Sequence, residues 1–165
     1  MIYEATVPVL SNFLKGLQVI LKKAEAHCIA RKIDPDAILK ARLFPDMFHF
    51  TRQVQLVTDF AKGACARLAG IAVPSYADEE KTFDELQARI AKTIDFLASL
   101  KKEQFAEAAA RPITIKVGGN DMTFSGTEYL MGYALPNFYF HLTTAYNILR
   151  HNGLELGKKD FMGRA

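Results

Sequence analysis

Apolar residues recur at spacings of three and four along four long segments, and this repeat constrains the fold more than any other feature of the chain. The spacing is that of an amphipathic α-helix with one face against a core. The stripes cover residues 6–30, 47–70, 83–97 and 130–153. Four such segments without an internal repeat predict an all-α protein, an antiparallel four-helix bundle.

Local signals set several helix boundaries. A capping aspartate followed by proline predicts a short extra helix over residues 37–43. Thr82 and Glu85 have the spacing of a capping box, in which each side chain bonds an amide of the other residue, so the third long helix should begin there. Pro136 lies inside the last helix and predicts a kink in it.

The segment before the last long helix has a different pattern. Residues 113–117 are rich in β-branched side chains, residues 118–120 read Gly-Gly-Asn, and residues 121–124 alternate again. Glycine and asparagine tolerate the positive φ of a tight turn, so this pattern predicts a β-hairpin. Ser125 and Glu128 then form a second capping box at the start of the last helix.

Length, charge and cysteine content favour an ordinary soluble domain. We expect one domain over residues 1–165. The 21 basic and 18 acidic residues give a net charge of +3 without a basic stripe, so we expect no nucleic-acid partner. No apolar run reaches membrane-span length, and we expect no membrane association. Cys28 and Cys65 are expected as buried free thiols, and the absence of a signal peptide favours a cytoplasmic location.

A polar trio on the last helix is the most informative candidate site. Asn137, His141 and Thr144 are spaced to share one face, which overlaps the apolar face of the helix. A core-facing histidine can ligate a divalent metal such as zinc or nickel. The alternative is a core histidine hydrogen-bonded to Asn137, Thr144 or a residue of another helix, since buried polar groups need partners. We favour this alternative, because asparagine and threonine are poor metal ligands.

The second long helix offers two further groups. His49, which we place in its first turn, is the strongest candidate there for another metal ligand, although a structural or surface role is the simpler interpretation. Asp59 and Lys62 are three residues apart and could be polar pocket groups, although an exposed helix pair is the more common arrangement. No nucleophile elbow, phosphate-binding loop or zinc-protease motif is present. The short basic tail from Leu154 to Ala165 either packs back or stays mobile.

Several stretches together resemble a known family. The resemblance is to the domain-of-unknown-function family numbered nineteen ninety-three, within the DinB-like superfamily of helical metalloproteins, and it runs over nearly the whole chain. The stretches are KAEAHCIARKIDP (23–35), RQVQ (52–55), FAKGACARLAG (60–70), TFDELQARI (82–90) and LPNFYFHLTTAYNILRHNG (135–153).

This resemblance implies a fold and a site. Better-known DinB-like proteins have four antiparallel helices and hold a divalent metal with one histidine of the second helix and an H-x-x-x-H pair on the fourth. Here His141 aligns with the second histidine of that pair, Asn137 replaces the first, and Gln53 or Gln55 lies nearest the position of the second-helix ligand. The resemblance therefore implies a degenerate metal site.

Three functions remain open from the sequence. The first is a bundle that binds a small molecule without catalysis in a pocket of Asn137, His141, Thr144 and Gln53. The second is a metal-dependent transferase or isomerase, resembling thiol transferases, that acts through His141 and His49. The third is a homodimeric interaction module, suggested by the aromatic residues 138–140.

Overall fold

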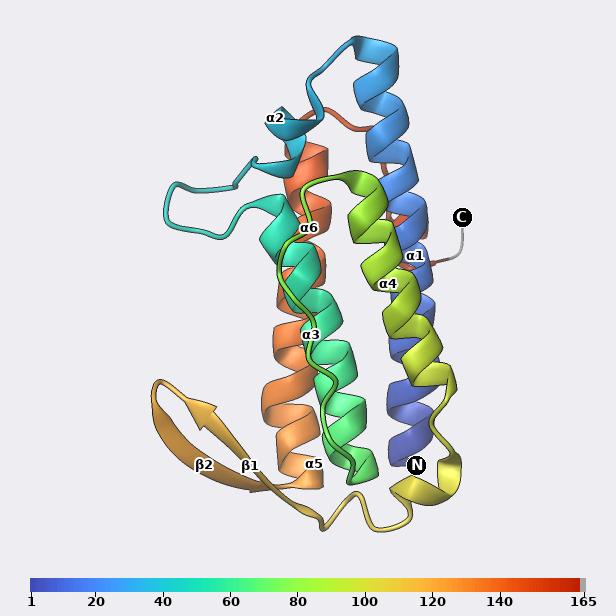
Figure 1. Ribbon diagram of the computed structural model, residues 1–165, viewed down its shortest axis with the longest axis vertical. Helices are drawn as coiled ribbons and strands as arrows, with labels where there is room; N and C mark the ends of the chain where they lie inside the picture. Colours follow the sequence, from blue (N-terminus) through green and yellow to red (C-terminus); the bar gives the residue numbers. More distant parts are fainter. Residues whose placement is uncertain (164–165) are drawn as a thin grey trace.

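Four long helices lie side by side in the computed structural model, which describes residues 1–163 (Figure 1). They are α1 (Ile2–Arg31), α3 (Phe50–Ala69), α4 (Phe83–Ala98) and α6 (Leu135–His151). α1 packs mainly against α4, α4 also packs against α3, and α3 packs most extensively against α6. The predicted mostly helical chain with four long helices is confirmed.

The core forms where the apolar stripes of these helices meet. Each fully buried leucine, isoleucine or phenylalanine contributes about 1.5–3 kcal/mol relative to an exposed one. Cys28 and Cys65 are buried free thiols in this core, as the sequence predicts. Fully buried core side chains include Leu10, Leu14, Leu17, Leu21, Phe50, Leu68, Leu86, Ile90, Leu97 and Phe138.

Two helix boundaries differ from those predicted. α2 (Pro35–Leu39) ends earlier than residue 43. The second long helix, α3, begins at Phe50 and not near residue 47. The cause is local: the backbone of His49 is extended (φ −72°, ψ 166°), and its side chain accepts a hydrogen bond from the amide of Arg52, which caps the helix at that point.

The predicted hairpin is present between α4 and the last long helix. A short 3-10 helix, η1 (Lys102–Phe105), precedes it, and β1 (Pro112–Val117) pairs antiparallel with β2 (Asn120–Ser125). The two turn residues, Gly118 and Gly119, have φ of 57° and 87°, values that favour glycine. The hairpin projects from one end of the molecule beside α5 (Figure 1).

The chain enters α6 through an irregular helical turn. The capping box of Ser125 and Glu128 starts α5 (Gly126–Tyr129), and a π-helical turn, η2 (Leu130–Ala134), follows. In this turn the amide of Leu135 bonds the carbonyl of Leu130, five residues back. Pro136 lies in the first turn of α6. A wider helical turn thus lies just before Pro136, and the kink at this residue stays a prediction.

The tail packs back on the molecule. Its helix α7 (Lys158–Phe161) lies against α1, where Asp160 pairs with Lys23. The Phe161 ring lies 5.6 Å from that of Phe13 in an edge-to-face contact. The last two residues of the predicted tail, 164 and 165, lie outside the described part of the chain.

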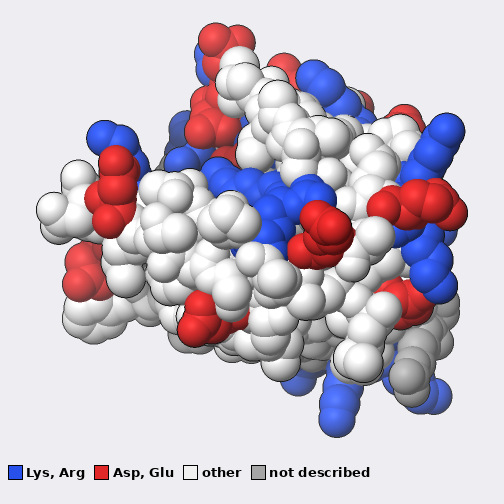
Figure 2. All heavy atoms as spheres, turned by 90° about the horizontal axis from the view of Figure 1, so that it is seen from below, with Lys and Arg blue, Asp and Glu red and all other residues white. Residues whose placement is uncertain are grey.

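On the face turned to the viewer in Figure 2, basic side chains form one small central cluster with acidic groups beside it, and no basic stripe crosses that face. None of the helices within residues 1–163 combines the length and apolarity that a membrane crossing requires.

Candidate functional site

The structure brings His141 of α6 and Gln53 of α3 together across the most extensive helix contact in the molecule. Nδ1 of His141 lies 2.8 Å from Oε1 of Gln53, and both residues are buried. The two positions are separated by 88 residues in the chain. This is the arrangement expected of a core histidine bonded to a residue of another helix.

The carboxamide of Gln53 fixes the tautomer of the histidine. Nε2 of Gln53 donates to the carbonyl of Phe48 at 3.0 Å, which leaves Oε1 to accept from His141. Nδ1 of His141 therefore carries the proton, and Nε2 of the neutral ring has a free lone pair. Within residues 1–163 this Nε2 has no hydrogen-bond partner, and it is not sealed from solvent.

Aromatic rings surround the histidine. The Phe60 ring stacks on it with centroids 5.5 Å apart and an interplanar angle of 16°, and Phe140 contacts it edge-on at 5.2 Å. Burial, helped by the positive charge of Arg52, lowers the pKa of His141 to about 4. The imidazole is consequently neutral at pH 7, when Nε2 acts as an acceptor.

Asn137 and Thr144 flank His141 but bond to their own helix. Nδ2 of Asn137 donates to the carbonyl of Tyr133, within the π-helical turn, at 2.8 Å. The hydroxyl of Thr144 donates to the carbonyl of Phe140 at 2.7 Å. The predicted trio shares a face, and the direct polar partner of His141 comes from α3 instead.

His49 has a structural role at the start of α3. The sequence places it in the first helical turn, whereas in the structure it is the capping residue before that turn. Its Nδ1 accepts from the amide of Arg52 at 3.3 Å, and burial is the main cause of a lowered pKa. One ring nitrogen is thus committed to the backbone, as the simpler interpretation of this residue predicts.

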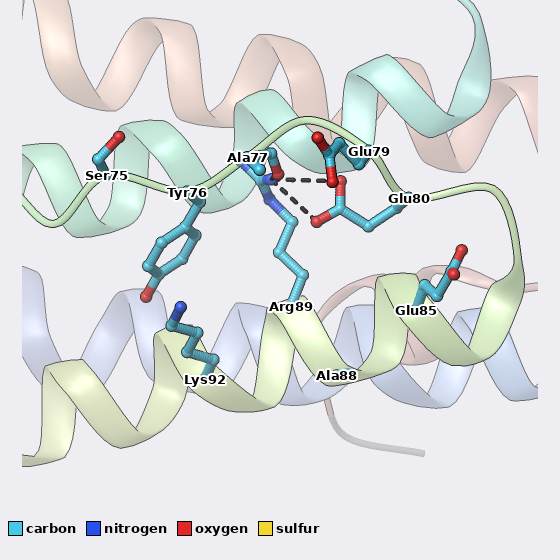
Figure 3. Close-up of a pocket in the computed structure, with 9 residues that line it drawn as sticks. All are labelled: Ser75, Tyr76, Ala77, Glu79, Glu80, Glu85, Ala88, Arg89 and Lys92. Atoms are coloured by element: carbon cyan, nitrogen blue, oxygen red, sulfur yellow. Dashed lines mark hydrogen bonds and ion pairs between the residues drawn. The ribbon is translucent and has the colours of Figure 1, made fainter.

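Sequence reasoning missed a buried arginine on α4. The guanidinium of Arg89, with 2% of its side chain exposed, lies 2.8 Å from Asp59, 3.0 Å from Asp78 and 3.1 Å from Glu80. Its Nε donates to the buried hydroxyl of Thr58 at 2.7 Å. Figure 3 shows Arg89 extending from α4 to the segment 71–82, which connects α3 to α4. The sequence contained one signal for this burial: Arg89 follows Leu86 by three positions, so it lies on the apolar face of the helix.

Around Arg89 lies an open pocket of about 390 Å³, with Tyr76 and Lys92 on one side and Glu79 and Glu80 on the other (Figure 3). The ammonium groups of Lys62 and Lys92 lie 4.7 and 4.4 Å from the centroid of the Tyr76 ring. Lys62 is buried and also pairs with Asp59 at 2.9 Å, so the two residues are not the exposed helix pair that their spacing most often indicates. All polar groups of Arg89 are engaged, so this cluster fastens the connecting segment.

Comparison with known proteins agrees with this architecture. The family model described as Domain of unknown function (DUF1993) matches residues 2–162. The chain belongs to this family. The chain is also similar to a DinB family member protein from Shewanella denitrificans, whose crystal structure was solved at 1.83 Å resolution; the two share 43% identity, and the TM-score is 0.90. The similarity covers 98% of this chain and 92% of the other. No curated protein matches it.

The DinB likeness of this DUF1993 protein raises the question of a divalent metal, and the donor atoms do not fit one. The positions that the resemblance assigns to metal ligands carry Asn137 and His141 on α6 and Gln53 or Gln55 on α3. The amide side chains of all three candidates other than His141 are committed to hydrogen bonds. Within residues 1–163 no group of three or more histidine, cysteine, aspartate or glutamate residues is arranged to hold a metal ion. A single imidazole nitrogen falls short of the three protein ligands usual in a catalytic zinc site.

Proposed function

We propose that this DUF1993 protein is a small-molecule-binding protein without catalytic chemistry, whose four long helices form an antiparallel DinB-type bundle with a degenerate metal site. The ligand site is the one around His141, Gln53, Asn137 and Thr144. The observation that carries this proposal is the hydrogen bond between His141 and Gln53. It supports the proposal because a fixed pair of polar side chains stands where the resemblance would lead one to expect metal ligands.

The same bond supports a definite mode of recognition. Because Gln53 holds the proton on Nδ1, the free Nε2 of His141 accepts a hydrogen bond from an N–H or O–H group of the ligand. The Phe60 ring, stacked on the imidazole, and the Phe140 ring, perpendicular to it, supply apolar contact. The expected ligand is an uncharged molecule with an apolar body and one donor group.

A metabolite screen tests the proposal. We would compare thermal shifts and ligand-observed NMR for the wild-type protein, His141→Phe and His151→Phe over a library that pairs hydrogen-bond donors with their O-methyl or N-methyl analogues. His141→Phe retains an aromatic ring beside Phe60 but removes the acceptor. The control His151→Phe alters an exposed histidine at the end of the same helix.

We expect ligands with a donor group to bind about tenfold more weakly to His141→Phe, because one hydrogen bond is lost in a desolvated site. Their affinity for His151→Phe should be unchanged. A library without hits, or hits that bind both variants equally, would refute the proposal. Long-range ¹H–¹⁵N spectra of the histidine rings test the tautomer separately. They should show Nδ1 protonated in His141.

A homodimer is a second candidate function, favoured by exposed aromatic residues near the same site. Phe140 on α6 and Phe48 before α3 have 56% and 53% of their surface exposed, and both adjoin the His141–Gln53 pair. Exposed aromatic side chains are enriched at protein interfaces. We further propose a cytoplasmic location, supported by the buried free thiols of Cys28 and Cys65.

A further inference from the structure

A second cavity, of about 440 Å³, lies between α3 and strand β1 of the hairpin. Leu56, Phe60 and Arg67 of α3, Ile115 and Lys116 of β1, and Tyr133 of the π-helical turn line it. We refer to this space as the hairpin cleft. Its volume falls in the range of small-molecule sites.

Aromatic rings form one wall of the hairpin cleft. The Phe60 and Tyr133 rings have centroids 5.9 Å apart at an angle of 59°. Tyr133 also stacks on Phe124 of β2 at 6.4 Å and on Tyr129 of α5 at 6.0 Å, so three elements hold its ring. Tyr133 belongs to η2, and π-helical turns occur frequently at functional sites.

The cleft carries an excess of positive charge. Neither Arg67 nor Lys116 forms an ion pair with any residue in the described range 1–163. The acidic residue of the lining, Asp59, is already paired with Lys62 and Arg89. The two cations of the lining therefore form no ion pair with the described residues, and the nearest acidic neighbour of Lys116 along the hairpin is Asp121, which lies opposite it in the strand register.

Arg67 is held in place before any ligand arrives. Its Nη1 donates to the hydroxyl of Tyr129 at 3.1 Å, and its guanidinium lies over the ring of that tyrosine. The side chain folds back over Gly63, where a Cβ would lie only 2.6 Å from Nη1. A glycine one turn earlier on the helix thus leaves room for this orientation, and a preorganised cation binds with a smaller entropic cost.

We propose that the hairpin cleft binds a small aromatic anion, a carboxylate or a phosphate ester. Its ring lies against Phe60 and Tyr133, and its anionic group bonds to Arg67 and Lys116. Planar guanidinium groups favour such oxygen pairs, and Lys116 adds a second charge from the hairpin. The proposal does not depend on His141, although the Phe60 ring borders both sites.

The test uses three naphthalene probes of similar size and different charge: the anion 2-naphthoate, the neutral 2-naphthamide and the cation of 2-(aminomethyl)naphthalene. A fourth probe, 2-naphthyl phosphate, distinguishes the two anionic groups. Each is titrated into the ¹⁵N-labelled protein, and amide shifts report where it binds. We expect saturable shifts at Lys116 and Tyr133 with the carboxylate or the phosphate. Binding of the neutral amide should be at least about tenfold weaker, because a charge-assisted contact is lost.

Variants then locate the anionic group. Lys116→Gln and Arg67→Gln should each weaken naphthoate binding about tenfold. Lys22→Gln, which removes an exposed charge on α1, should not change it. If Arg67→Gln disturbs folding because its bond to Tyr129 is lost, Lys116→Gln still tests the proposal, because Lys116 is exposed on the hairpin. Equal binding of anion and amide, shifts elsewhere on the protein, or an equal loss in Lys22→Gln would overturn the proposal.

Discussion

Replacing Arg89 by methionine should destabilise the protein by about 3 kcal/mol, the lower end of the cost of breaking a buried ion pair from one side. Asp59 and Asp78 keep other partners, Lys62 and Arg52, after the substitution. Glu80, with 14% of its side chain exposed, keeps only an amide partner and becomes the main uncompensated charge. For a chain of this length the melting temperature should fall by roughly 6–12 °C.

The assay is urea unfolding followed by circular dichroism, with Lys92→Met as the matched control. Lys92 is exposed one turn along α4 and contacts only the Tyr76 ring among these groups, so its loss should cost no more than about 1 kcal/mol. A double-mutant cycle with Glu80→Met identifies the mechanism. If Glu80 is the uncompensated charge, the double variant should be at least about 1 kcal/mol more stable than additivity predicts. An Arg89→Met cost below about 1 kcal/mol, or strict additivity, would refute the reasoning.

Four further predictions follow from named contacts. The pKa values of His141 and His49 are lowered in the folded state, so the unfolded chain binds more protons as the pH falls. The free energy of unfolding should therefore be highest above about pH 6.5 and fall toward pH 4, by at most about 3 kcal/mol from His141. In unfolding titrations at several pH values, His141→Phe should remove most of this pH dependence. Protein purified without a histidine tag and re-supplied with zinc or nickel should hold far less than one equivalent by mass spectrometry, and metal that disappears in His141→Ala would restore the metalloenzyme hypothesis. The thiol of Cys65, whose pKa burial raises to about 12, should resist Ellman's reagent until the protein unfolds, as should Cys28; fast labelling would contradict the packing. Light scattering should report a dimer that Phe140→Ser converts to monomer, and a wild-type monomer at high concentration would count against the interface.

The hairpin and its flanking helix starts were predictable because their signals are local. Two consecutive glycines adopt positive φ, and the capping pair of Ser125 and Glu128 bonds within four residues. His49 shows the limit of this approach. The apolar spacing of its neighbours suggested a place inside the helix, but its ring accepts a hydrogen bond from the amide of Arg52 and makes it the capping residue. The spacing of apolar residues does not distinguish a capping residue from one in the first turn.

The candidate site was predictable only in part. The face of α6 that carries His141 followed from helical spacing, and the need for a polar partner followed from its burial. That the partner is Gln53, and that it selects the Nδ1-protonated form, required the packing of α6 on α3 across 88 residues of chain. Arg89 was missed for the same reason, since its acidic partners lie on other segments.

The sequence by itself determined the helices, the hairpin and the residues that face the core, because capping, turn geometry and apolar periodicity act over a few residues. The tertiary structure alone decided which polar groups meet. It paired His141 with Gln53, fastened the segment 71–82 through Arg89, and placed Arg67 and Lys116, which form no ion pair within residues 1–163, beside an aromatic cleft. These outcomes depend on long-range packing. A polar contact in a low-dielectric interior is strong only at short distance, and the order of residues along the chain does not specify the distances between groups on different helices.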